Sequence, residues 1–188
     1  MIFLASLGTP EMPLDSDGKR LSEITYCLSL FPNTLIEHIP LLVEHFEPTN
    51  LYTASRIVWC ESRGYDDAYR KEDDDSGLFQ FIPSTWEWVR NYSPYDIPKW
   101  NSQILVINGQ PIGEVTNLIL TKSIPDFWEY DIVEIEYVQY LPEYNILAAS
   151  YLAQGMHNYN PTWKDWNSSK WCWGNINYYE SKWRKEGF

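Results

Sequence analysis

The chain has 188 residues, a length that favours one domain with a hydrophobic core of its own. Its formal net charge of −12 argues against nucleic acid and anionic membrane surfaces as partners, because both would repel it. With 44% hydrophobic residues and no low-complexity tract, the composition is not that of a disordered chain. No apolar run is long enough to cross a bilayer, so we expect no membrane insertion. Residues 1–8 are apolar but too short for a signal peptide, so export would need another route, a signal outside this sequence, or release from a virion.

Aromatic residues are more numerous than a core of this size requires, with ten tryptophans and fourteen tyrosines. Flat rings stack on the apolar faces of sugars, so the surplus favours a carbohydrate-binding groove. For any single ring, packing in the core is the simpler explanation. Composition alone therefore assigns no individual Trp or Tyr to a site.

Residues 1–50 are predicted to form an N-terminal helical arm packed on the rest of the chain. Residues 21–31 have a helical pattern, and Thr34 with Glu37 has the spacing of a capping box that opens a second helix. Pro40 is expected to interrupt or kink that second helix. No set of potential ligands has metal-site spacing, and nothing in the sequence suggests a cofactor.

A further helix is predicted over residues 51–62. Asn50 or Thr49 offers a side-chain oxygen that can cap the free N–H groups at its start. Gly64 follows the helix and can adopt the left-handed conformation that ends it.

Glu61 is the candidate general acid of this helix. Counting back in steps of three and four gives Val58, Ile57 and Ala54, so Glu61 continues an apolar stripe. Partial burial and the negative end of the helix dipole both favour the neutral carboxyl group and raise its pKa. A raised pKa suits a group that donates a proton near neutral pH.

The segment 76–86 combines a turn with the start of another helix. Gly77 permits a tight turn or a close approach of two backbones, and Gln80 offers both a donor and an acceptor. Pro83 fits the first turn of a helix. The charged run before it, residues 71–75, is either a solvated loop or part of a site.

Residues 101–141 are predicted to be β-rich. Two runs, 104–107 and 115–120, flank Asn108-Gly109 and Gly113, which indicates a hairpin. A further strand is expected within residues 127–140. Residues 142–156 then form a helix with small and apolar residues on all sides, as expected for a buried central helix.

Four segments together resemble the lysozyme-like lytic transglycosylases, including resuscitation-promoting-factor-like domains. The resemblance covers roughly residues 51–100 and 142–174, in the family's order. The segments are Cys60-Glu61-Ser62, then Gly77-Leu78-Phe79-Gln80 with Pro83 and Trp86, then residues 145–152, and finally residues 166–173 with Ser169 and Cys172-Trp173.

The resemblance implies an α+β fold, mainly α: a lysozyme-like catalytic domain over residues 51–188. The β-rich segment at about 101–141 would be an insertion that lines the groove or merely elaborates the surface. The implied activity is cleavage of the MurNAc–GlcNAc β-1,4 bond of peptidoglycan, in an extracytoplasmic setting, secreted or virion-associated. Glu61 would be the acid and base. The implied substrate-binding residues are Ser76, Phe79, Gln80, Asn145, Tyr151 and Trp171.

The resemblance also implies a disulfide between Cys60 and Cys172. It would close a loop of over a hundred residues, a stabilisation of about 4–5 kcal/mol in the chain-entropy model. The alternative is three buried thiols in a reducing compartment, with Cys27 as the third.

Transglycosylation is the predicted reaction type, because no second carboxylate is clearly placed, and hydrolysis is the alternative. An inverting hydrolase needs a second carboxylate that holds a water, as acidic residues do in goose-type lysozymes, and Asp73, Asp74 or Asp75 could supply it. A lytic transglycosylase needs no such partner. The family tends to have Ser where this chain has Asp75, so the partner of Glu61 is not predicted.

Two other classes remain as alternatives. One is a glycosidase of chitosanase type on the same fold, since an acidic surface suits a cationic glucosamine polymer. The other is an inactive wall-binding or virion structural module.

Overall fold

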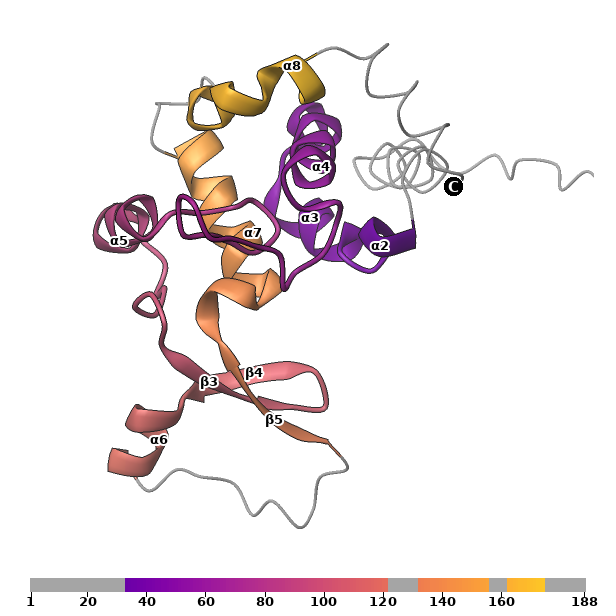
Figure 1. The fold of residues 1–188 in the computed structure, drawn as a ribbon. Coiled ribbons are helices and arrows are strands. Elements are labelled where there is room, and N and C mark those ends of the chain that lie inside the picture. The colour runs from indigo at the N-terminus through magenta and orange to yellow at the C-terminus, as the bar shows by residue number, and fades with distance from the viewer. Residues whose placement is uncertain (1–32, 122–131, 156–161, 175–188) are drawn as a thin grey trace, which may run out of the picture.

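The computed structural model describes residues 33–121, 132–155 and 162–174. These residues form a mainly helical α+β structure, which agrees with the predicted fold class at that level (Figure 1). Among them, no helix is both long and apolar enough to cross a membrane. The predicted helix at 21–31 lies outside the described residues, as do Cys27 and the first part of the strand expected within 127–140.

Helices make up most of the described structure. The α-helices are α2 (Asn33–Ile36), α3 (Ile39–His45), α4 (Pro48–Ser62), α5 (Pro83–Tyr92), α6 (Val115–Thr121), α7 (Pro142–Ser150) and α8 (Lys170–Trp173). Shorter turns of other helix types are the 3₁₀ segments η2 (Val138–Tyr140) and η4 (Lys164–Ser169) and the π-helical segment η3 (Tyr151–Gly155).

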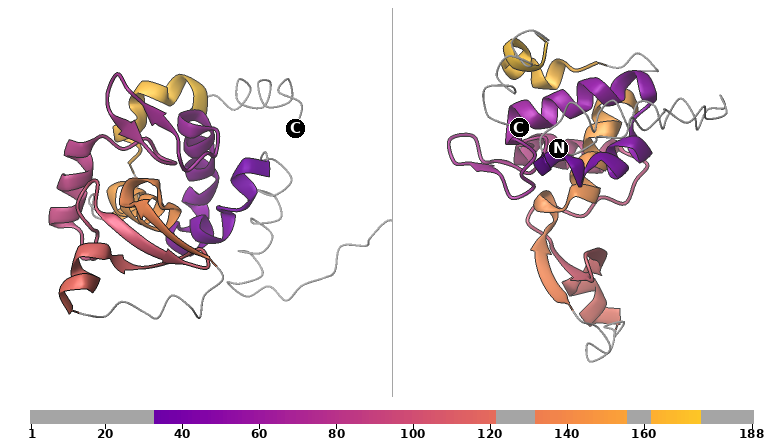
Figure 2. Two further views of the ribbon diagram at one scale, coloured as in Figure 1. Left: turned by 60° about the horizontal axis from the view of Figure 1, so that its bottom comes forward. Right: turned by 90° about the vertical axis from the view of Figure 1, so that its right-hand side faces the viewer.

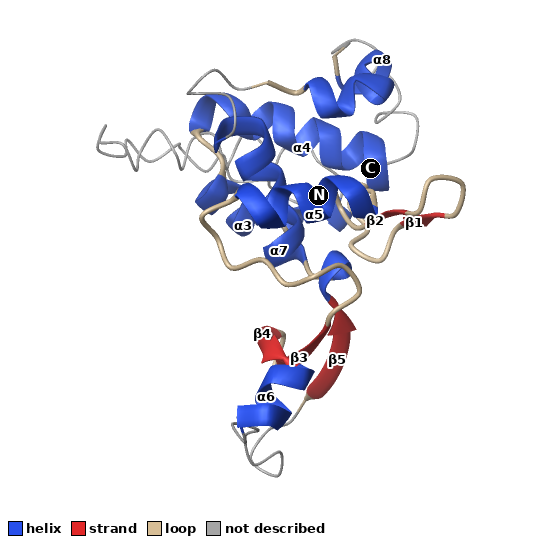
Figure 3. Ribbon diagram, turned by 90° about the vertical axis from the view of Figure 1, so that its left-hand side faces the viewer, coloured by secondary structure: helices blue, strands red, loops and turns tan. Residues whose placement is uncertain are grey.

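Two small antiparallel sheets complete the fold of the described residues. The first pairs β1 (Tyr69–Arg70) with β2 (Asp75–Ser76). The second has the order β4-β3-β5 and consists of β3 (Gln103–Ile107), β4 (Gln110–Glu114) and β5 (Val133–Tyr137). This second sheet extends from one end of the helical body, and α8 lies at the opposite end (Figures 1 and 3).

α4 begins earlier than predicted and is not capped as predicted. Its N-cap residue is Glu47, and no side chain caps the helix, so the capping role given to Asn50 or Thr49 is wrong. The Asn50 amide instead donates to Gln154 Oε1 at 3.2 Å, and the Glu47 backbone N–H donates to the same oxygen at 2.9 Å. A residue remote in sequence thus supplies the contact expected from a local cap.

The end of α4 follows the predicted rule with a shift of one residue. Arg63 is the C-cap residue and takes the left-handed conformation with φ 61°, and Gly64 follows with φ 82°. Left-handed backbone at this place ends a helix because the next N–H group turns back to a free carbonyl. The Arg63 N–H donates to the Trp59 carbonyl at 3.1 Å.

The capping box predicted at Thr34 and Glu37 is also absent. Thr34 lies inside α2, and its hydroxyl donates to the Arg63 carbonyl at 2.7 Å. The helical conformation is interrupted between α2 and α3. Pro40 lies in the first turn of α3, where its missing N–H breaks no helical hydrogen bond. The two short helices bury four side chains in the same core as α4: Leu35, Ile39, Leu42 and Val43.

The predicted hairpin is present at Asn108-Gly109, where φ is 50° and 77°. Two consecutive positive φ values are the mark of a type I′ turn, which matches the twist of antiparallel strands. β5 pairs with the other edge of β3, as part of the expected strand.

The strand predicted over 115–120 is wrong, because this segment is α6. Local side chains favour the helix: Asn117 Nδ2 donates to Glu114 Oε2 at 2.6 Å, and the Thr121 hydroxyl donates to the Asn117 carbonyl at 2.9 Å. Both contacts join positions three or four apart, which are neighbours only in a helix.

α7 is the buried central helix that the sequence predicts. Five of its residues are buried, and it packs against α3 and α5. α4 packs against α3 on one side and α8 on the other (Figure 2). The core that they share positions the last turn of α4 beside η4 and the β1–β2 hairpin.

Candidate active site

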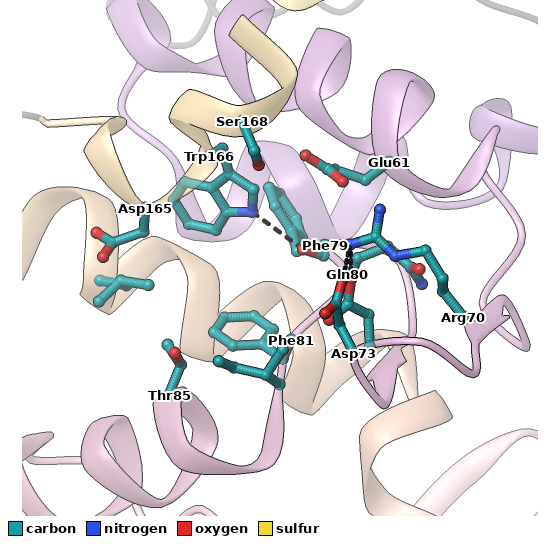
Figure 4. A pocket seen from close by; sticks show the side chains of 13 residues that line it. Glu61, Arg70, Asp73, Phe79, Gln80, Phe81, Thr85, Asp165, Trp166 and Ser168 are labelled. Carbon is teal, nitrogen blue, oxygen red and sulfur yellow. Dashed lines mark hydrogen bonds and ion pairs between the residues drawn. The ribbon is translucent and has the colours of Figure 1, made fainter.

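A pocket of about 310 Å³ lies where five parts of the chain meet: the end of α4, the β1–β2 hairpin with the loop after it, the start of α5, η3 and η4 (Figure 4). Figure 4 shows the Glu61 carboxylate and the Ser168 hydroxyl on one wall and Thr85 on the opposite wall. The lining residues are Glu61, Arg70, Asp73, Asp75, Phe79, Gln80, Phe81, Ile82, Thr85, Leu152, Asp165, Trp166 and Ser168.

Glu61 occupies the last turn of α4, and the apolar stripe below it is buried as predicted. Ala54, Ile57 and Val58 have no exposed surface, while Glu61 itself is partly buried at the pocket wall. Burial raises the pKa of the Glu61 carboxyl group above its ordinary value, and two neighbours act in the opposite direction: a hydrogen bond from Ser169 and the positive charge of Arg70. The dominant cause is loss of solvation, which penalises the charged form.

The Ser169 hydroxyl is shared between two acceptors. It donates to the Trp166 carbonyl at 3.0 Å and also lies within reach of the Glu61 carboxylate. Because a hydroxyl has one proton, it can serve only one of the two at a time. Ser169 can therefore follow the protonation state of Glu61, donating to the carboxylate when the charge is present.

Arg70 brings a positive charge to the pocket from the β1–β2 hairpin. Its guanidinium forms an ion pair with Asp75 across the hairpin and lies 3.5 Å from Asp73. The Asp75 side chain is almost fully buried, so this pairing compensates a charge that would otherwise be costly. Two of the three aspartates considered as a second carboxylate are thus already engaged by Arg70.

The loop 76–81 makes the tight turn and the close approach that Gly77 predicts. Gly77 has φ 76°, and a Cβ on it would lie 2.2 Å from both Asn145 Nδ2 and the Gln139 carbonyl oxygen. Gln80 reaches the pocket, but its amide nitrogen donates to the Ala68 and Gly77 carbonyls at 3.1 and 2.9 Å. Of the Gln80 amide, only the carbonyl oxygen stays available to a ligand.

Asn145 is not brought to the pocket. It is completely buried, and its amide accepts from the Phe79 N–H at 2.9 Å and donates to the Gln139 carbonyl at 3.0 Å. Ser76 is buried as well, and its backbone exchanges hydrogen bonds with Phe81. Both residues therefore stabilise the loop that shapes the pocket, and neither forms part of the pocket surface.

Three other predicted site residues lie outside the pocket lining. Tyr151 donates its hydroxyl proton to the Tyr92 carbonyl at 2.5 Å, which directs it to α5 instead of Glu61. Trp171 is 63% exposed on α8. Asp74 sits in the hairpin turn with φ 59°. Phe79 does line the pocket, although its ring is buried against Trp166.

Trp166 and Asp165 are two of the pocket residues that sequence reasoning did not assign to the site. The Trp166 indole donates to the Phe79 carbonyl at 3.0 Å, and its own carbonyl accepts from the Trp173 indole at 2.8 Å. The Asp165 carboxylate has no hydrogen bond or ion pair within the described residues. The Cys60–Cys172 pairing could have indicated both, because it brings the segment before Cys172 to the end of α4.

The implied disulfide is present between Cys60 and Cys172, with 6.1 Å between their Cα atoms. It joins α4, one residue before Glu61, to α8, which directly follows η4. The covalent link therefore fixes the general-acid candidate and the Trp166 wall of the pocket to each other.

In the described part of the chain, no three His, Cys, Asp or Glu side chains are grouped so that they could hold a metal ion. Comparison with protein-family models, with curated proteins and with solved structures gives no match to this chain.

Proposed function

We propose that the protein cleaves the β-1,4 bond between MurNAc and GlcNAc in peptidoglycan, with Glu61 as general acid and then general base. One observation carries the proposal: a carboxyl group with a raised pKa faces a pocket lined with aromatic rings and hydrogen-bonding groups. Perturbed acids in pockets are frequent at catalytic sites.

Transglycosylation uses Glu61 twice. The neutral carboxyl group donates its proton to the glycosidic oxygen as the bond from that oxygen to C1 of MurNAc breaks. The resulting carboxylate then accepts the proton of the MurNAc C6 hydroxyl, whose oxygen bonds to C1 and closes a 1,6-anhydro ring. No water is consumed, and Glu61 ends the cycle protonated as it began.

The neighbours of Glu61 suit both halves of this cycle. Burial favours the neutral acid that starts the reaction, while Arg70 and Ser169 favour the carboxylate that exists midway. A group stabilised in only one state would perform one half of the cycle poorly. This balance supports an acid that must also act as a base.

Hydrolysis is the second candidate, and Asp165 is the observation that favours it. Asp73 and Asp75 are engaged by Arg70, whereas the Asp165 carboxylate shares the pocket with Glu61 and is not engaged by any described residue. In an inverting hydrolase it would hold the attacking water. The product would then be an ordinary reducing sugar.

Mass spectrometry of purified peptidoglycan after digestion tests both candidates. Transglycosylation predicts muropeptides lighter by one water than hydrolytic products, and Asp165→Asn should retain this activity. Hydrolysis predicts reducing ends that disappear in Asp165→Asn. Absence of cleavage by the wild-type protein would overturn the proposal.

A further inference from the structure

An aromatic face continues from the pocket along α5. Thr85, which lines the pocket, is followed on the same helix by Trp88 and Tyr92, three and seven residues later. Positions i, i+3 and i+7 share one face of a helix, and seven residues advance it by about 10 Å. Thr85 and Asp165 lie on the side of the pocket away from Arg70, so the face leads outward from that side (Figure 4).

The rings on this face are exposed but held in place. Trp88 is 38% exposed and Tyr92 64%, and their ring centroids are 4.8 Å apart with an interplanar angle of 34°. Tyr95 is 45% exposed and meets Tyr151 edge to face at 6.4 Å. Tyr151 in turn donates to the Tyr92 carbonyl, and the next residue in the chain, Leu152, lines the pocket. Two elements, α5 and η3, thus run from the pocket to the same aromatic cluster.

We propose that this aromatic face, made of Trp88, Tyr92, Tyr95 and Tyr151, is a second glycan-binding site that holds the sugar chain beyond the pair of rings being cleaved. The inference rests on the proposed function, since its ligand is the continuation of the chain bound in the pocket. Sugar rings present flat C–H faces, which pack on aromatic faces through apolar burial and dispersion. Rings already fixed by mutual contact lose little conformational entropy when they bind.

The distance of the aromatic face from Glu61 means that the face affects binding and not the chemical step. The face touches no reacting atom, so it contributes equally to binding of the ground state and of the transition state. Such uniform binding lowers KM and leaves kcat unchanged. The face therefore favours long glycan strands over short ones without changing the chemistry.

The test compares Trp88→Ala/Tyr92→Ala with the wild-type protein on two substrates: soluble glycan strands freed of stem peptides, and a tetrasaccharide of the same repeat. Tyr137→Ala, an exposed tyrosine on β5, is the matched control. Both substituted rings are exposed, so the double variant should fold, which its unfolding curve checks. We expect KM for the strands to rise about tenfold, equivalent to about 1.4 kcal/mol. kcat on strands, both constants on the tetrasaccharide, and all values of the control should stay unchanged.

The experiment distinguishes failure of the second glycan-binding site from failure of the proposed function. Equal KM values for the wild-type protein and the double variant on strands, with cleavage intact, overturn the second site and leave Glu61 chemistry standing. A change in oligomeric state of the double variant by light scattering would instead make the face a contact between copies of this chain, which also overturns the glycan site. No cleavage of either substrate by the wild-type protein would remove the proposed function and this inference together.

Discussion

The helical body and the β4-β3-β5 sheet are built in different ways. In the body, side chains join segments far apart in sequence: the disulfide links positions 112 residues apart, and the Trp166 indole reaches a carbonyl 87 residues away. In the sheet, β5 is exposed along its whole length, with Ile135 56% exposed. The long-range contacts of the sheet are backbone pairings, such as Leu105 with Ile135 between β3 and β5. The difference teaches that the pocket is held by side-chain contacts between remote segments, whereas the sheet is held by its backbone ladder.

Removing the disulfide, which anchors the helical body, should cause the largest loss of unfolding free energy. Cys60→Ser/Cys172→Ser frees a loop closed across 112 positions, a loss of about 4–5 kcal/mol in the chain-entropy model. Urea unfolding measures it, with the wild-type protein under reducing conditions as the matched control. A double variant as stable as the oxidised wild-type protein would contradict the anchoring role of this link.

Two glycines with the same backbone conformation sharpen the contrast. Gly77 in the body and Gly109 in the sheet have φ of 76° and 77°. A Cβ on Gly77 meets Asn145 and the Gln139 carbonyl oxygen at 2.2 Å, whereas a Cβ on Gly109 meets nothing within 4 Å. We expect Gly77→Ala to cost about 3 kcal/mol or more, and Gly109→Ala about 1 kcal/mol. Equal losses in chemical denaturation would show that the body is no more tightly constrained than the sheet.

The stability of Glu61→Gln relative to the wild-type protein should depend on pH. Because burial raises the pKa of Glu61 in the folded state, the folded protein holds this proton more strongly than the unfolded chain does. The resulting stabilisation is fully present below the unfolded-state pKa and is lost as the pH rises through the folded-state pKa. Glu61→Gln carries no such charge, so its stability relative to the wild-type protein should improve from pH 4 to pH 8.

Thermal unfolding at several pH values measures this difference. Glu44→Gln is the control, because Glu44 lies exposed on α3 away from the pocket. A stability difference for Glu61→Gln that stays constant with pH would contradict the raised pKa.

The smallest effect is expected in the sheet. Ile135→Thr keeps a β-branched residue on exposed β5 and should change the unfolding free energy by no more than about 0.5 kcal/mol. Glycan cleavage should not change either. A loss of cleavage with folding intact would place the sheet at the site.

Local patterns predicted much of the body and part of the sheet. The apolar stripe under Glu61, the helix opened by Pro83 and the Asn108-Gly109 hairpin follow from neighbours in sequence. α6 was missed because its β-branched residues favour a strand until the side-chain contacts of Glu114 and Asn117 are seen. Each of these features depends on residues a few positions apart.

The rest of the site depends on contacts that sequence spacing does not reveal. Arg70 precedes a charged run that resembles a solvated loop, yet the hairpin turns it onto Asp75 and the pocket. Asp165 belongs to no sequence motif that would assign it to a site. The resemblance assigns Asn145 to the substrate, but the close approach at Gly77 uses its amide in the core.

The most direct test of the central claim is the rate of peptidoglycan cleavage by Glu61→Gln, measured beside Glu44→Gln and the wild-type protein. Glutamine keeps the shape of the side chain but cannot act as an acid, because its amide does not ionise at any accessible pH. We predict a loss of at least about a thousandfold for Glu61→Gln, with an unchanged fold by circular dichroism, and full activity for Glu44→Gln. A Glu61→Gln protein that cleaves at the wild-type rate would contradict the assignment of Glu61 as the catalytic acid.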